Sequence, residues 1–429
     1  MAGHIQDRWY KTETDIDGKT VRVKSDRHGT GMRYRARYVG PDGTEKSKSF
    51  SDGQKRLAEK WLSGIEADMT RGQYIDPRAG RVTVRQHAER WLASLTMDPG
   101  TFVSTEVRIR LHVLPHLGTR SLDSLRPIHV REWLRKLQDG GLAPSYQRVI
   151  FANLNAMMAA AVDDRLIPHN PCRSSSVKAP KPEPRRIVPW QPERVLAVRS
   201  ALPERYRAMV DLAGGCGMRQ GEVLGLAVDD VDFAAGVVQV VRQVKLIAGR
   251  QVFALPKGGK TRTVPLPDSV ARSLEHHIAQ QPPTGVSLPW RSVDGSPVTA
   301  SVLFRNVEGR AVNRVVFNRV AWRPALDTVG VPRGRENGMH ALRHFYASVL
   351  LDAGESIKVL SEYLGHHDPG FTLRTHTHLM PSSEKRTREA VSRAFGDGLA
   401  KTAAPPFQPA TLSTPKPLTS ANEEVRLEY

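Results

Sequence analysis

The side chains best suited to chemistry are arginines, lysines and histidines that lie beside glycines in the C-terminal half of the chain. In residues 214–222, a cluster of glycines allows the backbone to turn tightly before a new helix begins. Arg219 is therefore predicted near a helix start, with Glu222 one turn later on the same face. Such an arginine can hold phosphate oxygens bidentately while the carboxylate orients a neighbour. A surface ion pair in a turn is the alternative interpretation.

Residues 255–266 are predicted to form a hairpin whose turn carries Lys257 and Lys260. A lysine on a flexible turn can reach a phosphodiester and protonate a leaving alkoxide. Hairpin tips are also rich in lysine for solubility, so this segment alone does not establish that role.

A third segment places an imidazole and a guanidinium together at a helix start. His340 and Arg343 are three residues apart, so they are predicted to project from one side of a helix. Leu342, Phe345 and Val349 are predicted to face the core on the other side.

Histidines are concentrated after this point, because six of the fifteen fall between positions 340 and 378. His366 follows Gly365 at a predicted helix end, and His376 lies in a further helical turn. A metal-dependent nuclease or phosphoesterase is one interpretation of such a cluster. It is disfavoured because no nearby carboxylate has ligand spacing with a histidine pair.

Composition limits the class of protein. The 429 residues exceed one ordinary domain, and 39% hydrophobic residues provide material for real cores. Lysine plus arginine total 63 against 44 aspartate plus glutamate, a formal charge of +19 that predicts a polyanionic partner. No apolar stretch is long enough to span a membrane and no signal peptide is evident. Two cysteines, Cys172 and Cys216, cannot build a disulfide framework, which favours the cytoplasm.

Residues 1–78 are predicted to form a small sheet followed by a helix. Strand alternation puts arginines on one face, and two lysines recur at the same period after a turn. A solvated edge that resists aggregation is one interpretation, and a sheet laid into a DNA groove is the other. The candidate DNA-binding residues are Arg33, Arg35, Arg37, Lys46 and Lys48.

The rest of the chain is predicted to be mainly helical. Residues 83–171 carry four apolar stripes, including Val107, Leu111 and Leu114, and Thr83 is a helix cap. A proline-rich linker is expected over 172–186, a mixed α/β region over 187–395, and a flexible tail over 396–429. The fold class is therefore α+β and multidomain, mainly α.

Three of these segments match a known pattern in combination. They are Gly-Met-Arg-Gln-Gly-Glu at 217–222, the pair His340 and Arg343 followed by Leu-Gly-His at 364–366, and Thr-His-Thr-His-Leu-Met-Pro at 375–381. Together they resemble the tyrosine recombinases, in particular phage and mobile-element integrases of actinobacterial type. The resemblance covers nearly the whole chain. It implies an arm-type DNA-binding domain, a helical SAM-like core-binding domain and a recombinase catalytic domain.

The resemblance implies DNA strand exchange without a metal or other cofactor, through a covalent 3′-phospho-enzyme intermediate. Arg219 and Arg343 would hold the phosphate oxygens, and His340 and His366 would add hydrogen bonds and proton handling. Lys257 would protonate the leaving 5′ oxygen, with Lys260 as the alternative. Partners implied are double-stranded DNA with core and arm attachment sites, a DNA-bound homotetramer and a possible excision or directionality factor. The location implied is the cytoplasm, at the nucleoid.

One position departs from the family, because His376 occupies the place of the nucleophilic tyrosine. Tyr346 and Tyr363 are expected to pack within helices and cannot replace it. An imidazole reaches less far than a phenol, and a ~1 Å misplacement can cost ~100-fold in rate. Neutral histidine can in principle attack phosphorus. Because of its shorter reach, however, cleavage is expected to be impaired. The alternative is a catalytically inactive, site-specific DNA-binding or regulatory protein.

All the DNA-binding interpretations make one prediction. Affinity for DNA should fall steeply as salt rises, because lysine and arginine contacts to phosphate release counterions. Binding titrations across a series of salt concentrations measure this slope. An affinity that stays constant between low and physiological salt would exclude them.

Overall fold

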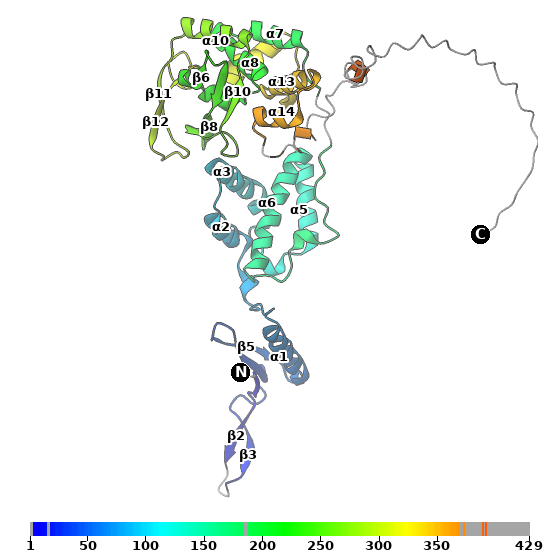
Figure 1. The fold of residues 1–429 in the computed structure, drawn as a ribbon. Coiled ribbons are helices and arrows are strands. Elements are labelled where there is room, and N and C mark those ends of the chain that lie inside the picture. Colours follow the sequence, from blue (N-terminus) through cyan, green and yellow to red (C-terminus); the bar gives the residue numbers. More distant parts are fainter. Residues whose placement is uncertain are drawn as a thin grey trace, which may run out of the picture.

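The computed structural model describes residues 3–14, 18–183, 188–366, 368, 370, 372–373, 388–389 and 391–392. These residues form an α+β structure, mainly helical with small antiparallel sheets. Figure 1 shows three bodies in chain order along one long axis, and separate clusters of buried hydrophobic residues lie within them.

The N-terminal body is a three-stranded antiparallel sheet covered on one face by a helix. Along the central strand, Tyr34, Ala36 and Tyr38 are buried towards the helix, as their alternation predicts. A two-stranded hairpin is inserted between the first two strands of the sheet and projects from it (Figure 1). In sheet order the strands are β1 (His4–Asp7), β4 (Tyr34–Val39) and β5 (Glu45–Phe50); the hairpin is β2 (Tyr10–Thr14) and β3 (Thr20–Lys24), and the helix is α1 (Lys55–Thr70).

The three arginines of this sheet differ in their surroundings. Arg35 and Arg37 lie on β4 and point away from α1, as predicted. Arg33 precedes the strand, and its guanidinium pairs with Asp7 at 3.0 Å and Asp52 at 2.8 Å. Of the three arginines, only Arg35 and Arg37 therefore belong to β4 itself, on the face of the sheet opposite α1.

The two lysines of β5 lie on the opposite face. Strand register pairs Lys46 with Tyr38 and Lys48 with Ala36, and directly paired residues share a face of a sheet. Lys46 also forms an ion pair with Asp76 at 2.8 Å. The five cations therefore do not form one continuous surface. Both strands have cations at every second residue, but the register places the lysines of β5 on the face opposite Arg35 and Arg37.

The second body is a bundle of helices joined by short turns. Thr83 caps its first helix, as the sequence predicts, and the structure adds a reciprocal capping box with Gln86. Three of the helices begin with proline, whose missing N–H costs nothing at that position. The helices are α2 (Val84–Ser94), α3 (Pro99–Arg108), α4 (Leu114–Leu117), α5 (Pro127–Asp139) and α6 (Pro144–Asp163).

A π-helical turn, η2 (Ile109–Val113), interrupts the regular period between α3 and α4. Ile109 and Val113 are fully buried, whereas Leu111 is 51% exposed. The predicted inward position of Leu111 was therefore wrong. The cause is the extra residue in a π turn, which shifts the inward face of the helix.

The helical core continues into the segment that the sequence predicts as linker. Cys172, in the short turn η4 (Pro171–Arg173), and Val177 are both buried against the helices. The beginning of residues 172–186 is thus part of the helical body, because two apolar side chains anchor it there.

The third body surrounds small sheets with helices, and it contains one large and one smaller cluster of buried residues. One sheet has the order β10-β7-β6, and two further pairs are β8-β9 and β11-β12. Its strands are β6 (Val231–Asp232), β7 (Val237–Val240), β8 (Gln243–Ile247), β9 (Arg250–Ala254), β10 (Arg262–Pro265), β11 (Thr284–Pro289) and β12 (Pro297–Val302). Its helices are α7 (Pro192–Ala201), α8 (Glu204–Gly215), α9 (Gln220–Gly225), α10 (Asp268–Gln280), α11 (Arg314–Phe317), α12 (Arg323–Thr328), α13 (His340–Asp352) and α14 (Ile357–Leu364).

The predicted hairpin over residues 255–266 is not present. Strand β9 pairs with β8, and β10 pairs with β7, so the segment between β9 and β10 connects two different sheets. A tight turn occurs within it, where the Gly259 N–H donates to the Pro256 carbonyl at 2.9 Å. The prediction was wrong because local turn residues do not reveal which strands pair.

The second and third bodies meet through α3 and β8, which face each other in Figure 1. Lys245 on β8 donates to both carboxylate oxygens of Asp98 at 2.8 Å. Asp98 also caps α3 by accepting from the Gly100 and Thr101 N–H groups. Among the described residues, every helix is too short or too polar to cross a bilayer.

The buried stripe of α6 makes a testable prediction about stability. Leu154 is fully buried in the helical core, so Leu154→Ala should lower the free energy of unfolding by about 2–5 kcal/mol. Leu111→Ala, at a position 51% exposed, should change it by no more than about 0.5 kcal/mol. Urea unfolding followed by helical circular dichroism measures both. Equal effects of the two substitutions would contradict the placement of Leu111 on the surface.

Candidate functional site

The centre of the candidate site is a buried carboxylate. Glu222 on α9 is fully buried and accepts hydrogen bonds from two arginines and one backbone N–H. Burial alone would raise the pKa of Glu222, but hydrogen bonds and charge from Arg262, with the charge and N–H of Arg219, lower it to about 2. Glu222 is therefore ionised at neutral pH and fixes the cations around it.

Arg219 is positioned by the start of α9, as the sequence predicts. It is the N-cap residue, and its own N–H donates to Glu222 at 2.9 Å while its Nη1 donates to the same carboxylate at 2.8 Å. Its Nη2 donates to the Gly365 carbonyl at 3.3 Å. The side chain is 20% exposed, so part of the guanidinium still faces solvent.

Arg343 lies deeper, on α13, and is 2% exposed. Its guanidinium donates to the Gly217 carbonyl at 2.8 Å and to the Leu364 carbonyl. Burial and the charge of Arg219 lower the pKa of Arg343, which means that its positive charge is held at an energetic cost. An anion bound beside it would relieve that cost.

The helix prediction for α13 was partly wrong. Arg343 faces inward with Leu342, and Val349 is 46% exposed. The sequence rule placed the guanidinium outside because charged side chains are rarely buried. Backbone carbonyls from two other segments reverse that preference here.

Two glycines allow these segments to approach. Gly217 has a φ of +64°, and a Cβ there would lie 2.4 Å from the ring of Tyr346. Gly365 ends α14 in the left-handed conformation, and a Cβ there would lie 3.1 Å from Arg262. A larger residue at either position would displace the groups that hold the arginines.

His340 begins α13 beside these cations. Although its side chain is exposed by area, surrounding protein atoms desolvate it, and together with the charges of Arg343, Arg219 and Lys257 they lower its pKa to about 4. His340 is therefore neutral at pH 7. Its ring contacts that of His344, with 4.6 Å between the centroids.

Lys257 and His366 complete the group. Lys257 is exposed on the loop between β9 and β10, close enough for its charge to act on His340. His366 follows Gly365, and its Nδ1 lies 2.6 Å from the Thr372 hydroxyl. The structure thus brings the predicted Arg219, Lys257, His340, Arg343 and His366 to one region, whereas His376 lies outside the described residues.

Sequence analysis missed Arg262, which contacts both oxygens of Glu222. Arg262 lies in the segment that was considered only for its lysines. It stands four residues before the buried Leu266, and nothing in this local sequence indicates that its partner, Glu222, lies 40 residues earlier in the chain. Its side chain is 7% exposed, so it belongs to the interior of the site.

The tyrosines near the site are packed, as expected. Tyr346 is buried, and burial raises its pKa. Tyr363 is partly buried, and its carbonyl accepts a hydrogen bond from Arg262. Within the described part of the chain, no three histidine, cysteine or acidic side chains gather as a metal-ligand set would.

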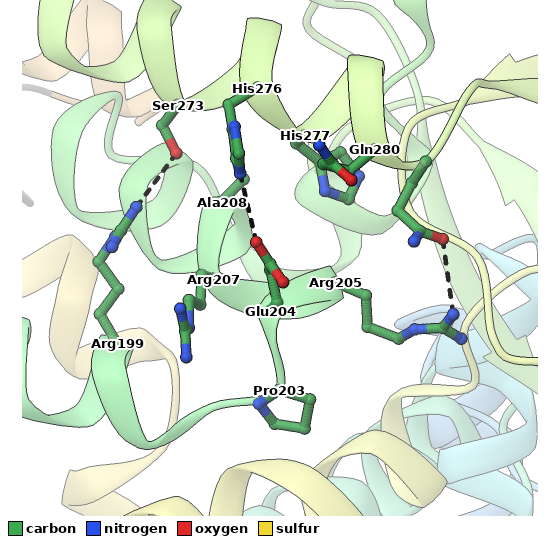
Figure 2. Close-up of a pocket in the computed structure, with 11 residues that line it drawn as sticks. Arg199, Pro203, Glu204, Arg205, Arg207, Ala208, Ser273, His276, His277 and Gln280 are labelled. Carbon is green, nitrogen blue, oxygen red and sulfur yellow. Dashed lines mark hydrogen bonds and ion pairs between the residues drawn. The ribbon is translucent and has the colours of Figure 1, made fainter.

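A separate cavity of about 350 Å³ lies between α8 and α10 and contains none of these residues (Figure 2). Groups along it pair with one another: Arg199 approaches Ser273 at 3.4 Å, and His276 approaches Glu204 at 3.3 Å. The cationic cluster around Glu222, and not this cavity, is therefore the candidate site.

Comparison with known families agrees with this geometry. Residues 186–382 match the phage integrase family, and residues 83–138 match the SAM-like N-terminal domain of phage integrases. Tyrosine recombinase XerC 1 of Ralstonia nicotianae is 30% identical over 269 residues, which cover 60% of this chain and 77% of that protein. This chain belongs to the phage integrase family.

Other members of the family match more of the integrase at lower identity. A XerC-like tyrosine recombinase of Caldanaerobacter subterraneus is 26% identical over 87% of this chain and 96% of its own length. The integrase of Mycobacterium phage L5 is 25% identical over 89% of this chain and 98% of its own length. The resemblance inferred from the short motifs is thus confirmed at the level of the family.

Solved structures show the same fold. The Tn1549 transposon integrase in complex with a circular intermediate DNA has a TM-score of 0.61 at 21% identity, covering 73% of this chain and 99% of that chain. A lambda integrase tetramer bound to a Holliday junction has a TM-score of 0.52 at 17% identity, covering 78% and 93%.

His340 should give the folded integrase a pH dependence. Its pKa is lower in the folded protein, about 4, than the usual 6.5, so the unfolded chain binds the proton first as pH falls. Stability from this group is therefore lost between pH 6.5 and about 4. The Tm of His340→Asn should fall less over that interval than the Tm of the parent, whereas His169→Asn, at an exposed histidine elsewhere, should follow the parent. Identical curves for all three proteins would mean that His340 is not held neutral.

Proposed function

We propose that this integrase is a site-specific DNA recombinase that breaks and rejoins strands at attachment sites through a covalent phospho-enzyme intermediate. The observation that carries the proposal is the cluster around Glu222. Two guanidinium groups, those of Arg219 and Arg262, pair with that one carboxylate, and the charge of a third, Arg343, also lies near it, which leaves net positive charge in a largely buried site. A phosphodiester is the anion that this arrangement would suit, because its charge would be balanced by donors already in place.

The proposed roles follow from exposure and charge. Arg219 and Arg343 would bind the non-bridging oxygens of the scissile phosphate, because their guanidinium groups attach to the same turn at residues 364–365. A neutral His340 can accept or donate a hydrogen bond there without adding charge, and His366 would act beside it.

Lys257 is the better candidate for the general acid. It is exposed on a loop, and its charge acts on His340, which supports Lys257 over Lys260. In the first step the nucleophile would form a bond to phosphorus as the bond to the 5′ oxygen breaks. Lys257 would give its proton to that oxygen, and the resulting 5′-hydroxyl would later attack the partner strand.

His376 would occupy the position of the nucleophile. Attack by its imidazole would form a phosphorus–nitrogen bond in place of the phosphotyrosine ester, and we infer that cleavage is impaired. A site-specific DNA-binding or regulatory role is the second candidate function, and the identity of residue 376 is the observation that favours it.

The other two bodies would supply binding. We propose that residues 1–78 bind arm sites, through a sheet face carrying Arg35 and Arg37, and that residues 83–171 bind core sites. The bridge between Asp98 and Lys245 supports a clamp formed by the second and third bodies. A DNA-bound homotetramer, a directionality factor and location at the nucleoid complete the proposal.

The test compares the integrase with its His376→Tyr variant on DNA that carries its attachment site. We expect both proteins to bind the site equally in a mobility-shift assay, since binding does not need the nucleophile. On a denaturing gel, the tyrosine variant should form a covalent protein–DNA adduct, and the parent should form little or none. An adduct of the parent that is acid-labile, as a phosphoramidate is, would instead identify His376 as a working nucleophile.

Two outcomes would count against the proposal. If both proteins bind the site but neither forms an adduct, the catalytic assignment of the cluster is wrong and the regulatory role is favoured. If neither protein binds any DNA fragment with salt-dependent affinity, the recombinase proposal fails entirely.

A further inference from the structure

Arg262 is so far described only through its partners, yet its side chain joins its own strand to two other elements. From the start of β10, its Nε donates to the Tyr363 carbonyl of α14 at 2.6 Å. Its Nη1 and Nη2 donate to the two oxygens of Glu222 on α9 at 3.1 Å and 2.7 Å. One planar group therefore fixes the distance between α9, β10 and the end of α14.

Both proposed phosphate-binding arginines depend on what Arg262 holds. Glu222 holds Arg219 by two hydrogen bonds, to its Nη1 and its backbone N–H. The residues after Tyr363 supply the other contacts, because Leu364 accepts from Arg343 and Gly365 accepts from Arg219. A shift of the carboxylate or of this turn would move both guanidinium groups.

The geometry requires arginine at this position. A guanidinium is a rigid fork that matches a carboxylate with two parallel hydrogen bonds and retains a further donor, whereas an ammonium is a point charge on a flexible stem. Space is also limited, because a Cβ on Gly365 would lie 3.1 Å from both Cδ and Nη1 of Arg262. The side chain is 7% exposed, so water cannot readily replace its contacts.

We propose that Arg262 is a positioning residue for DNA strand cleavage: it holds Glu222 and the turn after α14 so that Arg219 and Arg343 are preorganised for the scissile phosphate. This inference rests on the proposed function of the site. Arg262 does not itself need to touch DNA.

A positioning role has a pH signature that a purely structural role lacks. The charged groups around Glu222 are Arg219 at the N-cap of α9, Arg262 on β10 and Arg343 on α13. Burial raises the pKa of Glu222, and Arg262 is the first group that opposes it. Without Arg262, the pKa of Glu222 should rise above its present value of about 2. Once protonated, Glu222 should release Arg219.

The first experiment measures adduct formation in the His376→Tyr background. At neutral pH, Arg262→Gln should slow the adduct by about 100-fold, the cost of a ~1 Å misplacement. Arg262→Lys should recover part of the rate, because the ammonium keeps one contact to the carboxylate. The rate of Arg262→Gln relative to its parent should fall further as the pH is lowered, because Glu222 becomes protonated.

Arg242→Gln is the matched control. Arg242 also pairs with a mostly buried carboxylate, that of Asp230 at 2.6 Å, and its own side chain is 20% exposed. It should lower stability but leave the adduct rate relative to the parent independent of pH. If Arg262→Gln behaves like Arg242→Gln, or if lysine gives no recovery over glutamine, the positioning role is wrong.

The second experiment needs no cleavage and uses the chain with His376 in place. Affinity is compared for attachment-site DNA with a normal scissile phosphate and with a neutral methylphosphonate there. The parent and Arg242→Gln should prefer the phosphate, and Arg262→Gln should lose most of that preference. If no protein forms an adduct while Arg262→Gln still loses the preference, the proposed cleavage fails and the positioning role remains. An unchanged preference in Arg262→Gln would overturn the inference itself.

Discussion

The ionised carboxylate of Glu222 is the interaction on which the rest of the site depends. Burying a charge is costly unless it is paired, and here the pairing comes from two guanidinium groups on different elements. The same hydrogen bonds that compensate Glu222 fix the direction of each arginine. The anion site proposed here must hold several cations close together before the anion arrives, and one internal carboxylate reduces their mutual repulsion without neutralising it.

This constraint explains why the third body is built from short strands and turns. The elements that meet at Glu222 come from residues about 140 apart, from α9 to the end of α14. Left-handed glycines at 217 and 365 bring backbone carbonyls within reach of the arginines. A long continuous sheet would satisfy those carbonyls internally, whereas the ends of short elements leave them free to accept from side chains.

Sequence reasoning found the family and the fold class, and it proposed those residues of the candidate site that lie in compact motifs. Arg219 and Glu222 were readable because a helix cap is a local feature, and so was Thr83. It failed where the decisive partner is distant in the chain. The inward direction of Arg343, the role of Arg262 and the pairing of β10 with β7 all depend on such partners. The split of Lys46 and Lys48 from Arg35 likewise depends on strand register, which alternation alone cannot give.

The hairpin of β2 and β3 leaves the sheet and returns to it at adjacent points. Arg8 and Arg33, at its two ends, are joined by a backbone hydrogen bond of 2.7 Å, and β1 and β4 are direct neighbours. Inserting or removing residues there changes neither the sheet order nor the register of the arginine face. The hairpin is therefore an appendage of the sheet, and its length and sequence are decoupled from the positions of Arg35 and Arg37.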